Sequence, residues 1–223
     1  MSIWKTLLKL WGKAFELTKN LLAPEDKKVE KLLAIDPSIM RQLLPKSPAN
    51  IKDVFVLFDY GNKIVRLLVK SVKYKNNAGL RKRVAGFLYE DLMEISSEIT
   101  LFEGAPPIVV PMPMSKEEKR KKGFNQCEEL CREMQKLNPP SDGIEVSYNA
   151  LKKIRETKRQ TTLGRDERML NVINCMAAEN KIIKNKTVVV LDDVYTTLAS
   201  FSEARRALLA SGARRVIGLF IAH

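Results

Sequence analysis

The chain has few of the residues that disulfide frameworks and metal sites require. Its 223 residues include three cysteines and a single histidine, and that histidine is the last residue, His223. Three cysteines give no disulfide framework and indicate a reducing cytoplasm. Cys127 and Cys131 are spaced i, i+4 on an expected helix. With the histidine so far away in sequence, we expect both thiols to be small core side chains rather than zinc ligands, and we expect no zinc.

Long apolar runs are also absent. No stretch approaches 18 consecutive apolar residues, so we expect no transmembrane helix. The N-terminus lacks the compact apolar run and small-residue cleavage site of a signal peptide. Hydrophobic residues make up 45% of the chain and charged residues 29%, which indicates a folded protein rather than a disordered one. A chain of this length can bury one core, with room for a smaller appendage.

Acidic residues are in short supply. The chain has 39 Lys and Arg residues against 26 Asp and Glu residues, a formal net charge of +13. Such an excess attracts polyanions: nucleic acid, anionic lipid or phosphate-rich small molecules. The alternative is a generally lysine-rich surface, because the lysines are scattered along the whole chain and no groove-reading motif accompanies them.

The first 50 residues are expected to form a mainly helical N-terminal region. Residues 3–22 place apolar side chains, including Trp4 and Trp11, on one helical face, with lysines elsewhere around the axis. A basic amphipathic helix of this kind could lie on a membrane surface, dock on a partner or pack on its own domain. Four prolines break the residues that follow into short helical pieces: Pro24, Pro37, Pro45 and Pro48.

Strand and helix patterns alternate in the rest of the chain. Residues 51–100 predict a connecting region with a strand over 54–60, a turn at Gly61-Asn62 and helices over 63–75 and 80–96. The predicted core, residues 101–223, reads in order as strand 107–111, helix 116–136, weak strands within 144–154, helix 166–174, strand 187–191, helix 201–211 and strand 215–221. This alternation predicts an α/β fold with a mainly parallel sheet flanked by helices.

Two adjacent carboxylates mark the end of the strand over 187–191. Asp192 and Asp193 come directly after this apolar run, and Thr196, Thr197 and Ser200 then open a helix. Ligands of open α/β sheets bind at the carboxyl ends of the strands, and a helix N-terminus favours phosphate. Paired acids at this place suit a sugar diol or a Mg²⁺ ion that bridges to phosphate. The alternative is that the acids only end the strand and cap the helix.

A proline-rich and then strongly basic segment follows the strand over 107–111. Alternating prolines stiffen the loop, and the Met112–Pro113 bond is a candidate cis peptide. Five basic residues fall within seven positions: Lys116, Lys119, Arg120, Lys121 and Lys122. This cluster could hold pyrophosphate or a nucleic-acid backbone, and the alternative is a solvated helix face.

Four separated motifs resemble those of one protein family. Val-Val-Val-Leu-Asp-Asp-Val-Tyr-Thr-Thr, residues 188–197, resembles the phosphoribosyl-pyrophosphate (PRPP) loop of type I phosphoribosyltransferases, most closely the variant of the ComF competence family. The others are Val-Pro-Met-Pro with Gly-Phe-Asn-Gln at 123–126, the Arg- and Thr-rich segment 155–172, and Phe-Asp-Tyr at 58–60 with Lys-Tyr-Lys at 73–75. The resemblance spans about residues 54–222 and implies a type I phosphoribosyltransferase-like fold.

The resemblance also implies roles for individual residues. Asp192 and Asp193 would hold the ribose hydroxyls of PRPP, with Mg²⁺ bridging the diol and the pyrophosphate. The 5-phosphate would lie on a cradle of five residues: Thr196, Thr197, Leu198, Ala199 and Ser200. Pyrophosphate would face Met112, Pro113, Met114 and Lys116, and a lid would close over it with Arg155, Lys158 or Arg159.

Two departures from the family pattern bear on function. ComF proteins often carry a four-cysteine zinc knuckle after a Leu-Leu-x-Pro segment, but here Glu-Asp-Lys-Lys follows Pro24. The second departure is Leu198, where the family has glycine. If that position needs a positive φ, leucine costs on the order of 1 kcal/mol. We therefore expect a site that admits a phosphosugar but binds it weakly.

Two functions follow from these motifs. The first is a phosphoribosyl transfer to a nitrogen nucleophile. The second is a catalytically weak or inactive protein that serves DNA uptake, binding single-stranded DNA or competence proteins through Lys119, Arg120, Lys121 and Lys122. A third, weaker alternative makes the helix over 3–22 a membrane tether.

Overall fold

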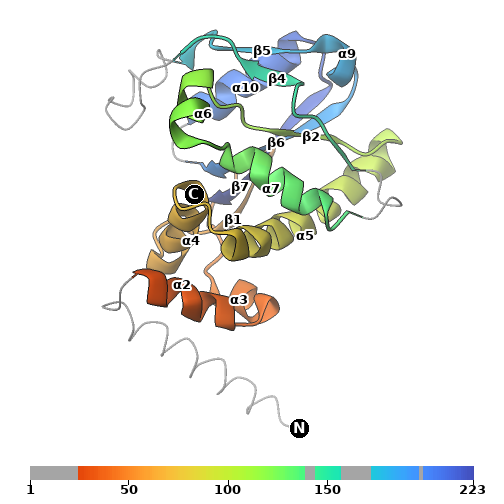
Figure 1. Cartoon of the computed structure of the whole chain (residues 1–223). Coiled ribbons are helices and arrows are strands. Elements are labelled where there is room, and N and C mark those ends of the chain that lie inside the picture. Colours follow the sequence, from red (N-terminus) through yellow and green to blue (C-terminus); the bar gives the residue numbers. More distant parts are fainter. Residues whose placement is uncertain (1–24, 139–143, 157–171, 196–197) are drawn as a thin grey trace.

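Five parallel strands form the central sheet of the protein (Figure 1). The computed structural model describes residues 25–138, 144–156, 172–195 and 198–223. The strand order is β1-β7-β6-β2-β3. The five strands are β1 (Val54–Phe58), β2 (Ile108–Pro111), β3 (Glu145–Val146), β6 (Thr187–Val194) and β7 (Arg215–Ala222).

The central strands are apolar on both faces. β6 begins with Thr-Val-Val-Val-Leu and its first five residues are buried, and seven of the eight residues of β7 are buried. β-branched side chains favour extended backbone, and a strand that is covered on both faces needs no polar alternation. These two strands therefore lie in the middle of the sheet.

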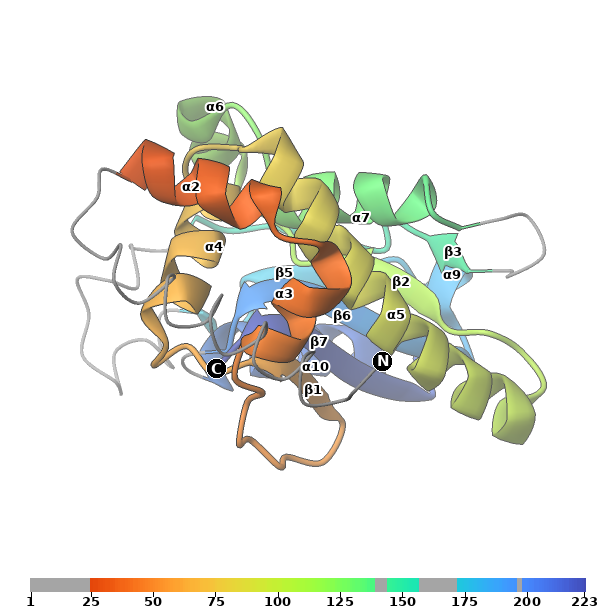
Figure 2. The same cartoon turned by 90° about the horizontal axis from the view of Figure 1, so that it is seen from below.

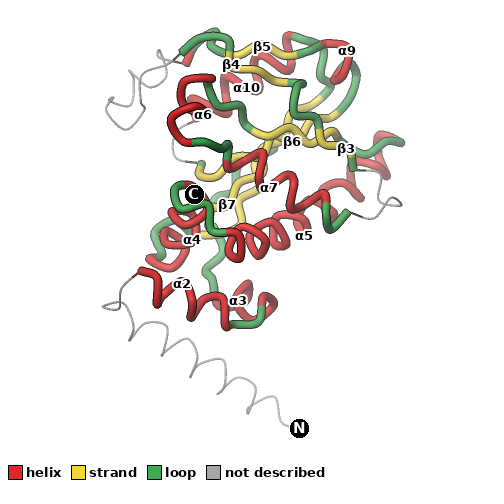
Figure 3. Tube along the Cα trace, viewed as in Figure 1, coloured by secondary structure: helices red, strands yellow, loops and turns green. Residues whose placement is uncertain are grey.

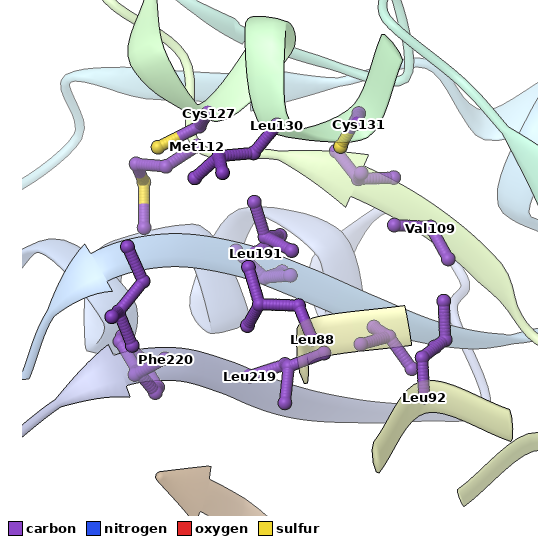
Figure 4. Close-up of a cluster of buried hydrophobic side chains, with 14 of the residues drawn as sticks. Leu88, Leu92, Val109, Met112, Cys127, Leu130, Cys131, Leu191, Leu219 and Phe220 are labelled. Atoms are coloured by element: carbon purple, nitrogen blue, oxygen red, sulfur yellow. The ribbon is translucent and has the colours of Figure 1, made fainter. Parts of the chain in front are cut away.

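Helices cover both faces of this sheet. Leu219 lies beside Leu88 of the long helix α5 (Figure 4), while the ring of Phe220 lies 5.6 Å from that of Phe201 in α10. Since successive strand residues point to opposite faces, α5 and α10 cover opposite sides. In the described ranges the helices are α2 (Glu25–Ala34), α3 (Pro37–Leu43), α4 (Lys63–Lys73), α5 (Ala78–Glu103), α6 (Lys116–Lys122), α7 (Gln126–Gln135), α9 (Asn180–Ile183) and α10 (Leu198–Ala210).

One hydrophobic core joins the described parts of the chain. It runs from Val29 of α2 to Ala222 of β7. Cys127 and Cys131 are buried in it on α7, as expected for small core residues (Figure 4). α2 and α3 lie against the α4 and α5 side of the molecule (Figure 2). A two-stranded antiparallel pair, β4 (Leu151–Lys153) and β5 (Met176–Ala178), packs on α10 at the opposite end (Figure 3).

The mainly parallel sheet flanked by helices confirms the predicted fold class, but the predicted start of the sheet is wrong. β1 pairs with β7, so the sheet begins at Val54 rather than near residue 107. The expected boundary at residue 101 falls inside α5, which continues to Glu103. Helix 80–96 is thus longer than expected, because no proline or glycine cap interrupts it before Gly104, whose φ is 73°.

The predicted helix 116–136 is also wrong, because it is two helices. Gly123 has a φ of 85° and ends α6 in the left-handed conformation that favours glycine. Asn125 then caps α7 by accepting a hydrogen bond from the backbone N–H of Cys127. The Met112–Pro113 bond is trans, so the candidate cis peptide is not found.

Two other predicted helices fall wholly or mostly on residues that the structure does not describe. The amphipathic helix over 3–22 and most of the helix over 166–174 lie outside the described residues. Within the described ranges, no helix is both long enough and apolar enough to cross a membrane.

Candidate functional site

The acid pair and the proline-rich loop lie at the same edge of the sheet. β2 and β6 are neighbouring parallel strands, so their carboxyl ends lie together. Met112 follows β2 and donates its backbone N–H to the carbonyl of Leu191, 2.8 Å away. Asp192 is the next residue of β6. The structure therefore brings together two segments that are 80 residues apart in sequence, as the parallel sheet predicts.

Asp193 is buried and has polar partners on both carboxylate oxygens. Its Oδ1 accepts the backbone N–H of Val194 at 2.7 Å. Its Oδ2 accepts from Gln126 Nε2 at 2.7 Å and lies 3.0 Å from Lys73 Nζ. Only 5% of the Asp193 side chain is exposed. Burial of a carboxylate at this level requires such donors, because an unpaired buried charge is costly.

Asp192 is more accessible and less completely bonded. Its Oδ1 accepts the backbone N–H of Asp193 at 2.8 Å and faces the thiol of Cys127 at 3.5 Å. No residue of the described ranges donates to its Oδ2. Burial, reinforced by the charge of Asp193 and opposed by Lys73, raises the pKa of Asp192 to about 7. Its charge therefore changes near neutral pH.

Two lysines set the electrostatics beneath the pair. Burial disfavours the charge of Lys73, but the carboxylates of Asp193 and Asp192 outweigh burial and raise its pKa above the usual value. Burial lowers the pKa of Lys122, and repulsion by Lys73 adds to this effect against the attraction of Asp193. Lys122 also lies 4.7 Å from the centre of the Phe124 ring.

The loop after β2 is fixed from behind by α7. The side-chain amide of Asn125 donates to the carbonyl of Met112 at 3.0 Å. Met112 is buried, whereas Pro113 and Met114 are partly exposed. Lys116 is exposed at the first position of α6, which begins with a complete capping box of Ser115 and Glu118.

The predicted phosphate cradle is described in part. Thr196 and Thr197 lie outside the described residues. Ala199 is buried and Ser200 is half-buried. Leu198 is the first residue of α10.

The segment predicted to form the lid is likewise described only in part. Arg155 donates from Nη2 to the carbonyl of Ile173 at 2.9 Å, which ties the two ends of the intervening segment. Lys158 and Arg159 lie outside the described residues.

The basic cluster on α6 is partly neutralised. Lys119 pairs with Glu128 at 2.8 Å, and Lys121 pairs with Glu117 one turn earlier. Lys122 is half-buried and donates to the side-chain oxygen of Gln126. Of the four residues assigned to a nucleic-acid surface, Arg120 is exposed and has no ion pair among the described residues.

The residues at the acid pair fit Mg²⁺ only if the ligand supplies most of its coordination. No group of three or more His, Cys, Asp or Glu side chains in the described ranges could hold a metal ion. The available Oδ2 of Asp192 offers one hard oxygen ligand of the kind Mg²⁺ prefers. A phosphosugar with a diol and a pyrophosphate could contribute the others.

Three residues of the site were not foreseen as such. Lys73, Gln126 and Cys127 hold the acid pair from α4 and α7. Lys73 and Gln126 belong to the family-like motifs at 73–75 and 123–126, and that membership was the available signal. Nothing in the local pattern pairs either motif with residue 193.

The chain is similar to a competence protein. It is 30% identical over 114 residues to Competence protein ComFC of Bacillus subtilis (strain 168). The matched part is 51% of this chain and 42% of the relative, so the chain spans less than half the length of that curated relative. No family model matches the chain. The similarity confirms the resemblance to the ComF family that the motifs predict.

Two solved structures show a weak structural likeness. They are HGPRT-ase from Leishmania tarentolae in complex with GMP, with a TM-score of 0.36, and L. donovani hypoxanthine-guanine phosphoribosyl transferase, with a TM-score of 0.38. Their sequences are 11% and 10% identical to this chain, which is covered to 63% in each case. The chain covers 66% of the first structure and 71% of the second.

Proposed function

We propose that this chain binds PRPP, or a related phosphosugar, together with Mg²⁺ at the carboxyl edge of the sheet. The acid pair carries this proposal. Asp192 presents a carboxylate oxygen without a described donor, beside the Met112–Met114 loop and ahead of the N-terminus of α10. A diol, a pyrophosphate and a 5-phosphate would each meet a group of suitable chemistry there.

Each part of the ligand has its own residues in this proposal. Asp192 would contact the ribose hydroxyls, and the Met112–Met114 loop with Lys116 would face the pyrophosphate. The start of α10 would receive the 5-phosphate through backbone N–H groups and hydroxyls. Mg²⁺, when bound, would neutralise part of the pyrophosphate charge. Arg155 would approach from the segment that follows β4.

Such a site would support a phosphoribosyl transfer. The bond from C1 of the ribose to pyrophosphate breaks, and a bond from C1 to a nitrogen nucleophile forms. Pyrophosphate leaves with the electron pair, and the nucleophile loses its proton. The chain's part in this reaction is to position the two reactants and to stabilise charge on the departing pyrophosphate.

Calorimetric titration of the full chain with PRPP and Mg²⁺ tests the proposal. The Asp192→Asn, Asp193→Asn double variant serves as the comparison. We expect saturable binding by the parent protein that the double variant loses while it stays folded. Absence of binding at millimolar PRPP would refute the proposal. Binding would justify a screen of nitrogen acceptors.

A second candidate function is DNA uptake. The name of the ComFC relative and the net charge of +13 favour a competence accessory that binds single-stranded DNA or partner proteins. The three described cysteines are free thiols, which suits the cytoplasm as the place of either function. The two functions share the fold but use different surfaces, so each can be tested by its own variants.

A further inference from the structure

The two acids at the end of β6 differ in their freedom to meet a ligand. Asp193 accepts from Val194 and Gln126, and Lys73 Nζ lies within 3.2 Å of both its carboxylate oxygens. Its side chain is 5% exposed. Asp192 is partly exposed and keeps one oxygen without a donor in the described part of the chain. A ligand that reached Asp193 would have to displace an ammonium and an amide.

We infer that the pair divides its work: Asp193 is a positioning residue held by Lys73 and Gln126, and Asp192 is the carboxylate that contacts the phosphosugar. This inference rests on the proposed function and makes it more specific. It also adds Lys73, from outside the β2–β6 edge, to the residues on which ligand binding depends.

Gln126 shows how firmly Asp193 is held. Its Nε2 donates to Asp193 at 2.7 Å, while its Oε1 accepts from Lys122. The reversed amide would place an NH₂ group against an ammonium and a carbonyl against a carboxylate, so both neighbours fix the same orientation. Asn125 precedes it and binds the carbonyl of Met112. Asp193, the start of α7 and the loop after β2 therefore form one hydrogen-bonded unit.

Lys73 supplies the positive charge that this unit needs. It is the last residue of α4, and its ammonium lies 3.0 Å from Asp193 Oδ2. Without it, a buried carboxylate would keep only neutral donors. The carboxylate would then turn toward solvent or toward another cation, and it would no longer hold Gln126 and, through the start of α7, the loop after β2 beside Asp192. Lys73 thus acts on the ligand through Asp193.

A double-mutant cycle on the full chain tests this division. PRPP affinity in the presence of Mg²⁺ and the ligand-free melting temperature are measured for Lys73→Met, Asp193→Asn and Asp192→Asn, and for the first substitution combined with each of the others. Asp192→Asn should weaken PRPP binding at least about tenfold without lowering the melting temperature. Lys73→Met should lower the melting temperature and weaken binding about three- to tenfold.

The combinations separate the two roles. Adding Asp193→Asn to Lys73→Met should cause no further loss of affinity and should recover part of the melting temperature, because both changes act on one ion pair. Adding Asp192→Asn should weaken binding further. Lys73→Arg keeps the positive charge and should therefore bind PRPP with the parent affinity. Lys70→Met is the matched control, since Lys70 lies on the same helix and pairs with Glu25 at the surface.

Different results overturn different claims. If Asp193→Asn weakens binding as much as Asp192→Asn and leaves the melting temperature unchanged, Asp193 contacts the ligand and the division of roles is wrong. Additive losses of affinity for Lys73 and Asp193 would also contradict it. If the parent protein does not bind PRPP, the proposed function fails, and with it the ligand contact of Asp192. The ligand-free cycle still reports separately whether Lys73 and Asp193 act as a pair. Should Asp193→Asn not fold, a loss of affinity in Lys73→Met that Lys73→Arg does not show supports the positioning role, and parent affinity in Lys73→Met contradicts it.

Discussion

The pKa of Asp192 links the candidate site to stability. The folded protein keeps a proton on this carboxyl up to about pH 7, whereas an unfolded chain loses it near pH 4. Between these values the folded state binds more protons, so the free energy of unfolding falls as the pH rises through this window. The loss is complete above pH 7.

Asp192→Asn should therefore stabilise the protein at pH 8 and have little effect near pH 4. We expect a gain on the order of 1 kcal/mol at pH 8, less than the full linkage value because the side chain is partly exposed. In a chain of this size the melting temperature should rise by about 2–4 °C. Thermal unfolding from pH 4 to pH 8 measures it. Asp26→Asn is the control, since its side chain is 91% exposed. A gain that does not depend on pH would contradict the assignment.

Leu198 offers a second prediction for a single residue. α10 begins at Leu198, and a glycine at this position would let a phosphate approach the start of the helix more closely. Leu198→Gly should tighten PRPP binding by about 1 kcal/mol, roughly fivefold in Kd. Calorimetry of both proteins decides this. Leu209→Gly, at an exposed position near the end of the same helix, controls for the loss of helix propensity. Unchanged or weaker binding by Leu198→Gly would remove Leu198 as the cause of weak binding.

Among the elements, the start of α7 both caps the helix and holds the loop after β2. Asn125 caps the helix and also holds the carbonyl of Met112. Asn62 caps α4 in the same manner, and it has no such second bond among its described contacts. Asn62→Ala should cost about 1 kcal/mol as a lost cap. Asn125→Ala should cost about 1 kcal/mol more, because a buried carbonyl also loses its donor. Urea unfolding of the two variants compares them, and equal losses would show that the loop bond adds no stability.

The elements whose signals are local could be predicted from the sequence. The valine run of β6, the apolar run of β7 and the alternation with helices gave a parallel sheet, because burial on both faces leaves a continuous apolar pattern. The acid pair and the loop after β2 were expected at one edge for the same reason. The break at Gly123 has a local signal too, since glycine after a basic last turn is a common helix end.

The rest depends on contacts between distant residues. β1 pairs with β7, and no local pattern shows that this strand joins the central sheet rather than a separate connecting region. Lys73 and Asp193 are 120 residues apart, and the burial that raises the pKa of Asp192 exists only after α4, α7 and β6 have packed. Sequence alone indicated acids and lysines of the right kinds, but it could not assign one lysine to one acid.

On the scale of the whole molecule, fewer positive charges are free to bind DNA phosphates than the net charge of +13 suggests. Lys119 and Lys121 form ion pairs with acidic residues of α7 and α6, and Lys122 donates a hydrogen bond to Gln126. Surface ion pairs of this kind contribute little to stability, but they reduce the counterions that a lysine can release on binding DNA. Among the described residues, Lys116 and Arg120 are the cations of this segment that have neither an ion pair nor a side-chain hydrogen bond, and both are exposed.

If the protein binds single-stranded DNA, these two residues should therefore matter most. Lys116→Ala with Arg120→Ala should lower the slope of log affinity against log salt concentration by about 1.4, near 0.7 for each lost phosphate contact. Lys119→Ala with Lys121→Ala, matched in number and helix, should change it less, because Glu117 and Glu128 already compensate those charges. Fluorescence anisotropy of a labelled oligonucleotide, titrated at salt concentrations from about 50 to 200 mM, measures both slopes.

Two results together would exclude α6 as the DNA surface. The first is that both variants and the parent have equal slopes. The second is that binding is unchanged when Lys119, Arg120, Lys121 and Lys122 are all alanine. A steep slope in that quadruple variant would then point to lysines elsewhere on the molecule, because a net charge this large still attracts DNA when one helix is neutral.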